Sequence, residues 1–272
     1  MPELPEVEIL ADEMNHKVKG KEIQGFIIDR ERNPDFPIDA FHRTINNTKI
    51  KNTSRKGKML LIELSNHHCL LIHLMLVGQV ILTQRTDYNA KSTELILNLD
   101  NNWHLWIVGV ALKYIQFGTC DEIENLPALK KLGIDPLDKR FTLALFKEKL
   151  ARKKGIIKSV LLNQSLIAGI GNTYVDELLF AAGIKPDRSV SSLTEKEVAK
   201  IFHSITHVLQ EGIRWGGASD IAFVHLDGSK GSFQEHFNVN RRKGKPCPVC
   251  GHKIEKTMLS GRGTYFCPQC QK

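Results

Sequence analysis

The spacing of hydrophobic and polar residues near the start of the chain predicts an amphipathic helix over residues 5–19. Its apolar residues recur every three or four positions, with charged residues between them: Val7, Leu10, Met14 and Val18. Gly20 follows where the helix should end, because glycine readily adopts the left-handed backbone of a helix terminus. We therefore expect the chain to open with a helix that buries one face.

The pattern beyond this helix indicates short strands. Leu60, Ile62 and Leu64 alternate with other residues, a period of two that is typical of a strand. These three residues belong to the segment Met59–Leu64. Three further aliphatic and β-branched segments follow: Cys69–Thr83, Glu94–Asn98 and Trp103–Val110, the first of which is interrupted by Gly78. Several short strands separated by turn residues predict a β-sandwich or barrel.

Helical patterns dominate the second half of the chain. The expected segments are residues 142–152 with Thr142 as cap, 159–165, 172–182, and a helix from Thr194–Glu197 to Gly216-Gly217. Thr194 and Glu197 have the spacing of a capping box, in which each side chain binds the other residue's backbone N–H. Residues 218–240 are expected to form a loop anchored by Phe233 and Phe237.

Length and composition limit the class of protein. With 272 residues the chain can form two domains with a sizeable core. It has no apolar run of about 18 residues, which argues against a membrane-spanning helix. No secretory signal precedes the acidic N-terminus, so we expect a cytoplasmic protein.

Positive charge is concentrated near the C-terminus. The formal net charge is +8, and residues 241–272 hold eight lysines and arginines against one acidic residue, Glu255. A local basic cluster of this kind indicates a polyanionic partner, of which nucleic acid is the commonest. A solvated basic tail is the alternative that charge alone leaves open.

Four cysteines near the C-terminus have the spacing of a zinc ribbon. Cys247 and Cys250 form one C-x2-C pair, and Cys267 and Cys270 form a second pair sixteen residues later. Four thiolates leave no open coordination position, which predicts one structural Zn²⁺. Disulfides or free thiols are the alternative, and a reducing cytoplasm disfavours disulfides. Cys69 and Cys120 lie outside the pattern, and Cys69 is expected to be a small buried hydrophobic residue.

Two glycine-rich turns could contact phosphate. Arg262 stands between glycines in an expected hairpin of the ribbon, where its bidentate fork suits a phosphate group. Gly169-Ile170-Gly171 separates two helical segments, and the following helix start offers backbone N–H donors together with the Asn172 side chain. A solvent-exposed arginine and a packing turn are the alternatives. A dinucleotide-binding turn is disfavoured because G-x-G-x-x-G is incomplete and no strand precedes it.

The octapeptide Met1–Glu8 can also be interpreted chemically. If Met1 is removed, Pro2 becomes a terminal secondary amine, and terminal amines have a reference pKa of about 7.7–8.0. Such an amine is partly neutral and nucleophilic near pH 7, and Glu3 beside it could move a proton. The alternative is structural, because proline and acidic residues are both common in the first turn of a helix.

Taken in order, these motifs resemble the formamidopyrimidine-DNA glycosylase / endonuclease VIII family of base-excision repair enzymes. The resemblance covers essentially the whole chain. It rests on MPELPEVE at the start, SRKGKMLLIEL at 54–64, HLMLVG at 73–78, LGIDPLD at 132–138, NQSLIAGIGNTYVDELLFAAGIKPDR at 163–188 and the zinc ribbon.

The resemblance implies a catalytic group at the N-terminus. Pro2 would attack C1′ of a damaged nucleoside and form an iminium, and Glu3 would act as general acid and base. Glu6 would support that site. No metal or redox cofactor would take part at the reaction centre.

The resemblance also implies a set of phosphate contacts. Lys58 would bind phosphate and assist β-elimination, and Arg262 would bind phosphate and assist δ-elimination. His73 and Asn172 would join them in gripping the backbone around a flipped nucleotide. Taken singly, Lys58 could be a solvated lysine at a strand end and His73 a core histidine.

The chain departs from the family in the residues that fill the vacated base stack. Trp106–Lys113 lacks the usual Arg-x-Phe wedge, and Leu76 stands at the usual Met position with Met75 beside it. Apolar side chains can unstack DNA, so Leu76, Leu112 or Phe117 could substitute. Gly217-Ala218-Ser219-Asp220 also replaces the threonine-rich start of the loop that covers the lesion base in such enzymes.

Together these observations predict an α+β multidomain fold. We expect an N-terminal helix and β-sandwich over residues 1–120, a linker at 121–140, a helix-two-turn-helix domain at 141–240 and a zinc ribbon at 241–272. The expected function is a bifunctional DNA glycosylase/AP lyase with altered or weak lesion preference, acting as a monomer on damaged or abasic double-stranded DNA of the nucleoid. The alternatives are a non-catalytic binder of distorted DNA and a zinc-dependent RNA-binding module.

Overall fold

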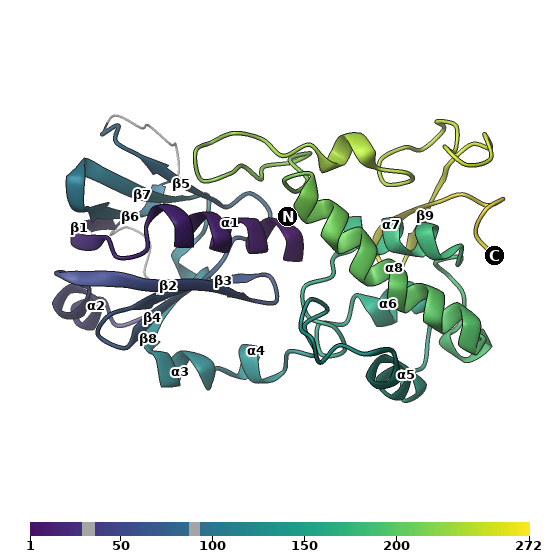
Figure 1. The fold of residues 1–272 in the computed structure, drawn as a ribbon, viewed down its shortest axis with the longest axis horizontal. Coiled ribbons are helices and arrows are strands. Elements are labelled where there is room, and N and C mark those ends of the chain that lie inside the picture. The colour runs from purple at the N-terminus through teal and green to yellow at the C-terminus, as the bar shows by residue number, and fades with distance from the viewer. Residues whose placement is uncertain (29–35, 87–92) are drawn as a thin grey trace. The chain divides into compact units, whose positions relative to one another are not determined.

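The chain forms two compact units (Figure 1). The computed structural model describes residues 1–28, 36–86 and 93–272. The first unit consists of Met1–Lys130 and Trp215–Gln234, and the second of Lys131–Arg214 and Glu235–Lys272. A segment late in the chain therefore returns to complete the first unit. Among the described residues, no helix has both the length and the apolar character needed to cross a bilayer.

The expected N-terminal helix is present as α1 (Leu4–Lys17). Its fully buried side chains are Leu4, Val7 and Met14. The carboxylate of Glu6 accepts a hydrogen bond of 2.8 Å from the backbone N–H of Glu3, one of the donors that a helix start leaves unpaired. The chain then turns at Gly20, whose φ of +83° places it in the left-handed region.

Within the described part of the first unit, eight antiparallel strands form the rest of the framework, in the order β5-β7-β6-β1-β2-β3-β4-β8. They are β1 (Glu22–Ile28), β2 (Thr48–Lys56), β3 (Met59–Leu64), β4 (His68–His73), β5 (Gln79–Thr83), β6 (Thr93–Leu99), β7 (Trp103–Val108) and β8 (Ile115–Thr119). The pairs Glu22↔Lys49 and Ile23↔Thr48 join the first four strands of this order to the last four. The result is the predicted β-sandwich, and α1 runs alongside β2 in Figure 1.

The hydrophobic pattern indicated β3, β4, β5, β6 and β7 but not β1, β2 or β8. β2 shows why, because two of its buried positions are threonines rather than aliphatic residues. Thr53 is 2% exposed, and its hydroxyl donates to the carbonyl of Ala11 in α1 at 2.7 Å. The short helices α2 (Ile38–Ile45), α3 (Cys120–Glu124) and α4 (Pro127–Lys130) were also not predicted.

The second unit is helical, with a two-stranded ribbon. Its helices are α5 (Leu143–Ala151), α6 (Ile157–Leu161), α7 (Asn172–Ala182) and α8 (Glu195–Arg214), and its strands are β9 (Glu255–Leu259) and β10 (Arg262–Phe266). The Thr142 hydroxyl accepts from the N–H of Leu145 at 3.3 Å, so the predicted cap of α5 is confirmed. The predicted capping box of α8 is also present, because Thr194 and Glu197 each accept from the other's N–H.

The segment LGIDPLD at 132–138 packs against the turn that precedes α7. Gly133 donates to the carbonyl of Gln164 at 2.8 Å, and Ala168 donates to the carbonyl of Ile134 at 2.9 Å. A Cβ atom at Gly133 would lie 2.4 Å from the carbonyl of Leu166. This close backbone approach requires glycine and fixes the conformation of the turn.

Cys69 and Cys120 form a disulfide, whereas the sequence disfavoured disulfides and suggested that Cys69 is only a small buried hydrophobic residue. Cys69 is buried, as predicted, at 3% exposure. The pairing of β4 with β8 sets Cys69 opposite Gly118, so Cys120 at the start of α3 comes within reach, with a Cα–Cα distance of 5.0 Å. The bridge lies in a small apolar cluster with Leu61, Leu71 and Ile123.

We expect the disulfide to stabilise the first unit. It links residues 51 positions apart, and closing a loop of this size in the unfolded chain corresponds to about 2–4 kcal/mol. Reduction should lower the free energy of unfolding by this amount in urea titrations followed by tryptophan fluorescence, since all three tryptophans (Trp103, Trp106, Trp215) lie in the first unit.

A C69A/C120A variant is the matched control, because reductant should leave its unfolding curve unchanged. Equal stability of the oxidised and reduced wild-type protein would contradict this prediction.

Candidate active site

The N-terminal residues are held by one buried carboxylate. Pro2 and Glu3 are both buried, Glu3 with 3% exposure. The Glu6 carboxylate accepts from the N–H of Glu3 through Oε2 and from the N–H of Ala218 through Oε1, each at 2.8 Å. Burial of a carboxylate is unfavourable without such donors. Glu6 therefore fixes the start of α1 and the start of the returning segment relative to each other.

Lys58 and His73 lie together in the first unit. Lys58 follows Gly57 (φ +61°) in the tight turn between β2 and β3, and the register pairs the next residue, Met59, with His73. Burial lowers the pKa of His73, and the positive charge of Lys58 lowers it further. The N–H of Met75 donates to Nδ1 of His73 at 3.2 Å. Both effects favour the neutral imidazole, and acceptance at Nδ1 leaves Nε2 as the nitrogen that carries the N–H donor.

The structure corrects two of the three proposed substitutes for the missing wedge. Leu112, in the short helix η2 (Leu112–Tyr114), is 1% exposed, and Phe117 in β8 is 7% exposed. Phe117 packs edge-on against Phe41 with ring centroids 4.8 Å apart. Both belong to the core, whereas Leu76, between β4 and β5, is 60% exposed. Local sequence could not separate them, because all three are apolar residues in apolar surroundings.

In the second unit, Asn172 and Lys158 hold the residue that follows Arg262. Asn172, the first residue of α7, donates from Nδ2 to the carbonyl of Gly263 at 2.9 Å. Nζ of Lys158 donates to the same carbonyl at 3.2 Å. Arg262 itself is exposed, at the first position of β10. The predicted hairpin therefore presents Arg262 from a backbone that two side chains fix.

Lys158 belongs to a buried polar network that the sequence did not reveal. Lys158 is 1% exposed, and its Nζ lies 2.7 Å from Oδ1 of Asp176, which is fully buried. Burial raises the pKa of Asp176 to about 6, while the charge and hydrogen bond of Lys158 and the N–H of Tyr265 oppose the shift. The ammonium of Lys158 at this distance stabilises the ionised form of Asp176. Nζ also donates to Thr264 Oγ1 at 2.8 Å, so the network ties α6 and α7 to β10.

The four ribbon cysteines have the geometry of a zinc site. Their Sγ atoms all lie within 4.8 Å of one another. The Cys247–Cys270 and Cys250–Cys267 distances are 3.8 and 3.5 Å, close to the ~3.8 Å edge of a tetrahedron with Zn–S bonds of about 2.3 Å. The cysteines therefore fit one structural Zn²⁺, as the spacing predicted.

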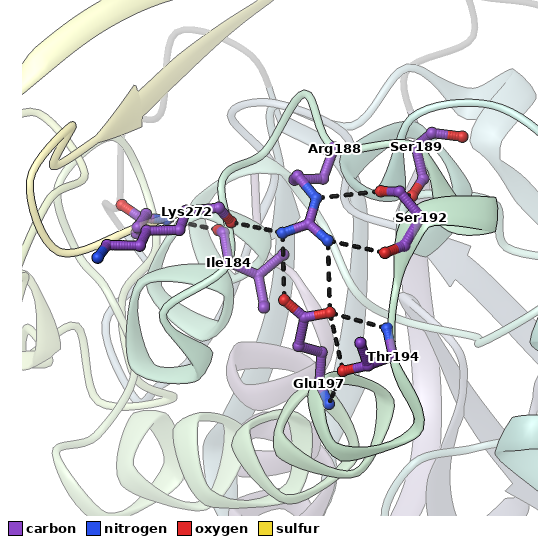
Figure 2. A network of polar contacts seen from close by, with 8 residues as sticks. Ile184, Arg188, Ser189, Ser192, Thr194, Glu197 and Lys272 are labelled. Atoms are coloured by element: carbon purple, nitrogen blue, oxygen red, sulfur yellow. Dashed lines mark hydrogen bonds and ion pairs between the residues drawn. The ribbon is translucent and has the colours of Figure 1, made fainter.

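The ribbon is anchored to the helices of its own unit. Gln271 accepts from the N–H of Cys267 at 2.8 Å and donates to the carbonyl of Ile184 at 2.9 Å. Figure 2 shows a second anchor, in which Arg188 donates to the carbonyl of Lys272 at 3.0 Å and pairs with Glu197 of α8. The ribbon is thus connected to the segment that follows α7 and, through Arg188, to α8.

Comparison with known proteins gives three matching family models in succession. They are the formamidopyrimidine-DNA glycosylase N-terminal domain (residues 1–110), its H2TH domain (132–223) and the zinc finger found in FPG and IleRS (244–272). A formamidopyrimidine-DNA glycosylase of Pelotomaculum thermopropionicum is 39% identical over 100% of this chain and 99% of the relative. The chain belongs to the formamidopyrimidine-DNA glycosylase family.

Solved structures of family members have the same fold. A Lactococcus lactis FPG mutant in complex with Fapy-dG-containing DNA superposes with a TM-score of 0.91 at 32% identity, covering 100% of both chains. The MutM (FPG) protein of Thermus thermophilus gives 0.87 at 32% identity, covering 99% of this chain and 98% of the other. The predicted fold class, family and zinc ribbon are therefore confirmed.

The proposed site residues divide between the units of this family member. Pro2, Glu3, Glu6, Lys58 and His73 lie in the first unit, and Asn172, Arg262 and the four cysteines in the second. Sequence reasoning missed Lys158 and Asp176, whose partners come from distant parts of the chain. A lysine in a short amphipathic segment carries no local signal that it will be buried.

We expect one zinc ion per chain, bound by the ribbon. Cys250→Ser removes one thiolate and should abolish stoichiometric zinc in elemental analysis of the purified protein, with loss of amide protection over β9 and β10. Cys120→Ser is the matched control, because this cysteine lies outside the site and should leave zinc at one equivalent. Full zinc content in the Cys250 variant would contradict the assignment.

We also expect Lys158→Met to destabilise the second unit by about 3–5 kcal/mol, because it leaves the buried Asp176 carboxylate without its cation. The readout is urea unfolding of helical circular dichroism, while tryptophan fluorescence reports the first unit as an internal control. Neutralising both partners in K158M/D176N should recover part of the loss. A double variant less stable than K158M would contradict this account.

Proposed function

We propose that the chain is a bifunctional DNA glycosylase/AP lyase of base-excision repair, with Pro2 as nucleophile. The observation that carries the proposal is the buried Pro2-Glu3 pair at the start of α1, held by Glu6 in the part of the chain that matches the family's N-terminal domain. The L. lactis family members were crystallised with DNA that contains Fapy-dG or an abasic site. Damaged or abasic double-stranded DNA is accordingly the proposed substrate.

The chemistry begins with removal of Met1. In the complete chain the Pro2 nitrogen is a tertiary amide, which cannot attack a carbon centre. Once freed, it is a secondary amine with a reference pKa of about 7.7–8.0 and is partly neutral at pH 7. It attacks C1′, the bond from C1′ to the base breaks, and the departing base takes a proton that Glu3 supplies. The C1′–O4′ bond of the sugar ring then breaks, O4′ takes the proton that Glu3 removes from the Pro2 nitrogen, and an iminium between Pro2 and C1′ remains.

Strand cleavage then follows by elimination from the iminium. In our proposal Lys58 binds phosphate and assists β-elimination, and Arg262 binds phosphate and assists δ-elimination. His73, as a neutral donor, and Asn172 complete the grip on the DNA backbone. The four ribbon cysteines would hold a structural Zn²⁺ that stabilises the hairpin carrying Arg262, and with four thiolate ligands it would have no open position for these steps.

The lesion preference of the enzyme should differ from that of relatives with the Arg-x-Phe wedge. Leu76 is the one of the three candidate wedges that is exposed, and an aliphatic wedge can fill a stack but cannot read the orphaned base by hydrogen bonds. We therefore propose weaker discrimination of the opposite base. We further propose that the protein acts as a monomer on nucleoid DNA in the cytoplasm.

The proposal predicts covalent trapping. Borohydride should reduce the iminium and join the protein to duplexes that contain an abasic site, dihydrouracil, formamidopyrimidine or oxidised guanine. Pro2→Gly should cripple trapping and spare DNA affinity, because a flexible primary amine replaces the secondary amine. Pro5→Ala, a proline change in the same helix that leaves the terminal amine intact, is the control.

If the protein binds these duplexes but forms an adduct with none of them, the proposed enzymatic activity is contradicted and a non-catalytic DNA-binding protein is favoured. Equal affinity for RNA and intact DNA at fixed salt would instead favour an RNA-binding module.

A further inference from the structure

Residues 217–226 are held against α1 by a second carboxylate, one that has no role in the proposed chemistry. Oε1 of Glu13 lies 2.6 Å from Nδ1 of His225, and Oε2 of Glu13 accepts from the N–H of Leu226 at 2.8 Å. The two side chains are only 23% and 16% exposed. This contact, which we call the Glu13–His225 latch, is therefore partly shielded from water, where hydrogen bonds to a charged group are stronger.

The latch lies at one end of the segment and Glu6 at the other. Glu6 binds the N–H of Ala218 and, through its other oxygen, the N–H of Glu3. Between the two ends, Gln79 of β5 donates to the carbonyl of Ala222 at 2.5 Å. Both ends of the segment are thus held by α1, the helix that directly follows Pro2 and Glu3, and its middle is held by β5.

Gly216, directly before the segment, and Gly217, its first residue, fit this arrangement. Gly216 has φ +70°, and a Cβ there would lie 3.0 Å from Nε2 of His225. Gly217 has φ +78°, and its Cβ would lie 2.9 Å from the ring of Phe223. Both rings therefore fold back over the glycine turn, which leaves the His225 ring little freedom to leave Glu13.

We propose that Glu13 and His225 are positioning residues that set the shape of the space a damaged base occupies beside Pro2. This inference rests on the proposed function. Between its two attachments the segment exposes Ile221, which is 48% exposed. A released segment would let this surface move relative to the start of α1. The effect requires a base, so it should be absent for a substrate that has none.

The experiment compares two substrates in single-turnover assays, a duplex with Fapy-dG and the same duplex with an abasic site. Glu13→Ala removes both contacts and should slow base excision roughly tenfold or more, as loss of hydrogen bonds to a charged group implies. His225→Ala leaves the Leu226 contact and should have a smaller effect. Strand cleavage at the abasic site should stay within about twofold of wild type for both variants, because neither alters the amine or the phosphate contacts.

Two further variants sharpen the result. Glu13→Gln keeps an oxygen that can accept from Leu226, so it should restore excision to between the Ala variant and wild type. Asp12→Ala is the matched control, since Asp12 is the adjacent residue on α1, with a side chain 71% exposed, and should excise like wild type. If Glu13→Ala does not fold, His225→Ala is used to compare excision of Fapy-dG with cleavage at the abasic site.

Unchanged excision of Fapy-dG in the folded variants would overturn the inference. An equal loss of excision and abasic-site cleavage would also overturn it, because that result indicates general destabilisation rather than base positioning. Failure of the wild-type protein to form a trapped adduct on abasic DNA would instead contradict the proposed function itself.

Discussion

The carboxylate of Glu6 joins the start of α1 to Ala218, 212 residues later in the chain. A buried carboxylate is tolerated because two backbone N–H groups, those of Glu3 and Ala218, donate to it. Its consequence is geometric. The residues that would carry the chemistry and the segment that returns to the first unit are bound to the same carboxylate, and Gln79 of β5 adds a direct contact between the sandwich and that segment.

In the second unit, buried side chains likewise fix the backbone next to a proposed site residue, the exposed Arg262. Arg262 is exposed, and the proposed phosphate contact would require a rigid backbone beneath it. The Gly263 carbonyl is fixed by Asn172 and Lys158, and the four thiolates close the ribbon on the other side of the hairpin. Lys158 is balanced in turn by Asp176, so a buried ion pair and a metal together support one surface side chain.

The elements that a local sequence pattern encodes could be predicted from the sequence. α1 and α7, the strands β3 to β7 and the cysteine spacing all follow from periodicity, caps or motif. Contacts and burial that depend on residues far apart in the chain could not be predicted in this way. The Cys69–Cys120 bridge requires the register of β4 on β8, and the burial of Leu112 requires the packed sandwich. The contact of Glu13 with His225 likewise joins residues 212 positions apart, which no local pattern encodes.

The most direct test of the central claim is to find the atom that bears the trapped DNA. After borohydride reduction on an abasic duplex, mass spectrometry of the digested adduct should place the sugar on a peptide that begins with Pro2, with Met1 absent. The account predicts attachment at the Pro2 nitrogen. An adduct on a lysine such as Lys58, or a trapped protein that still carries Met1, would contradict it.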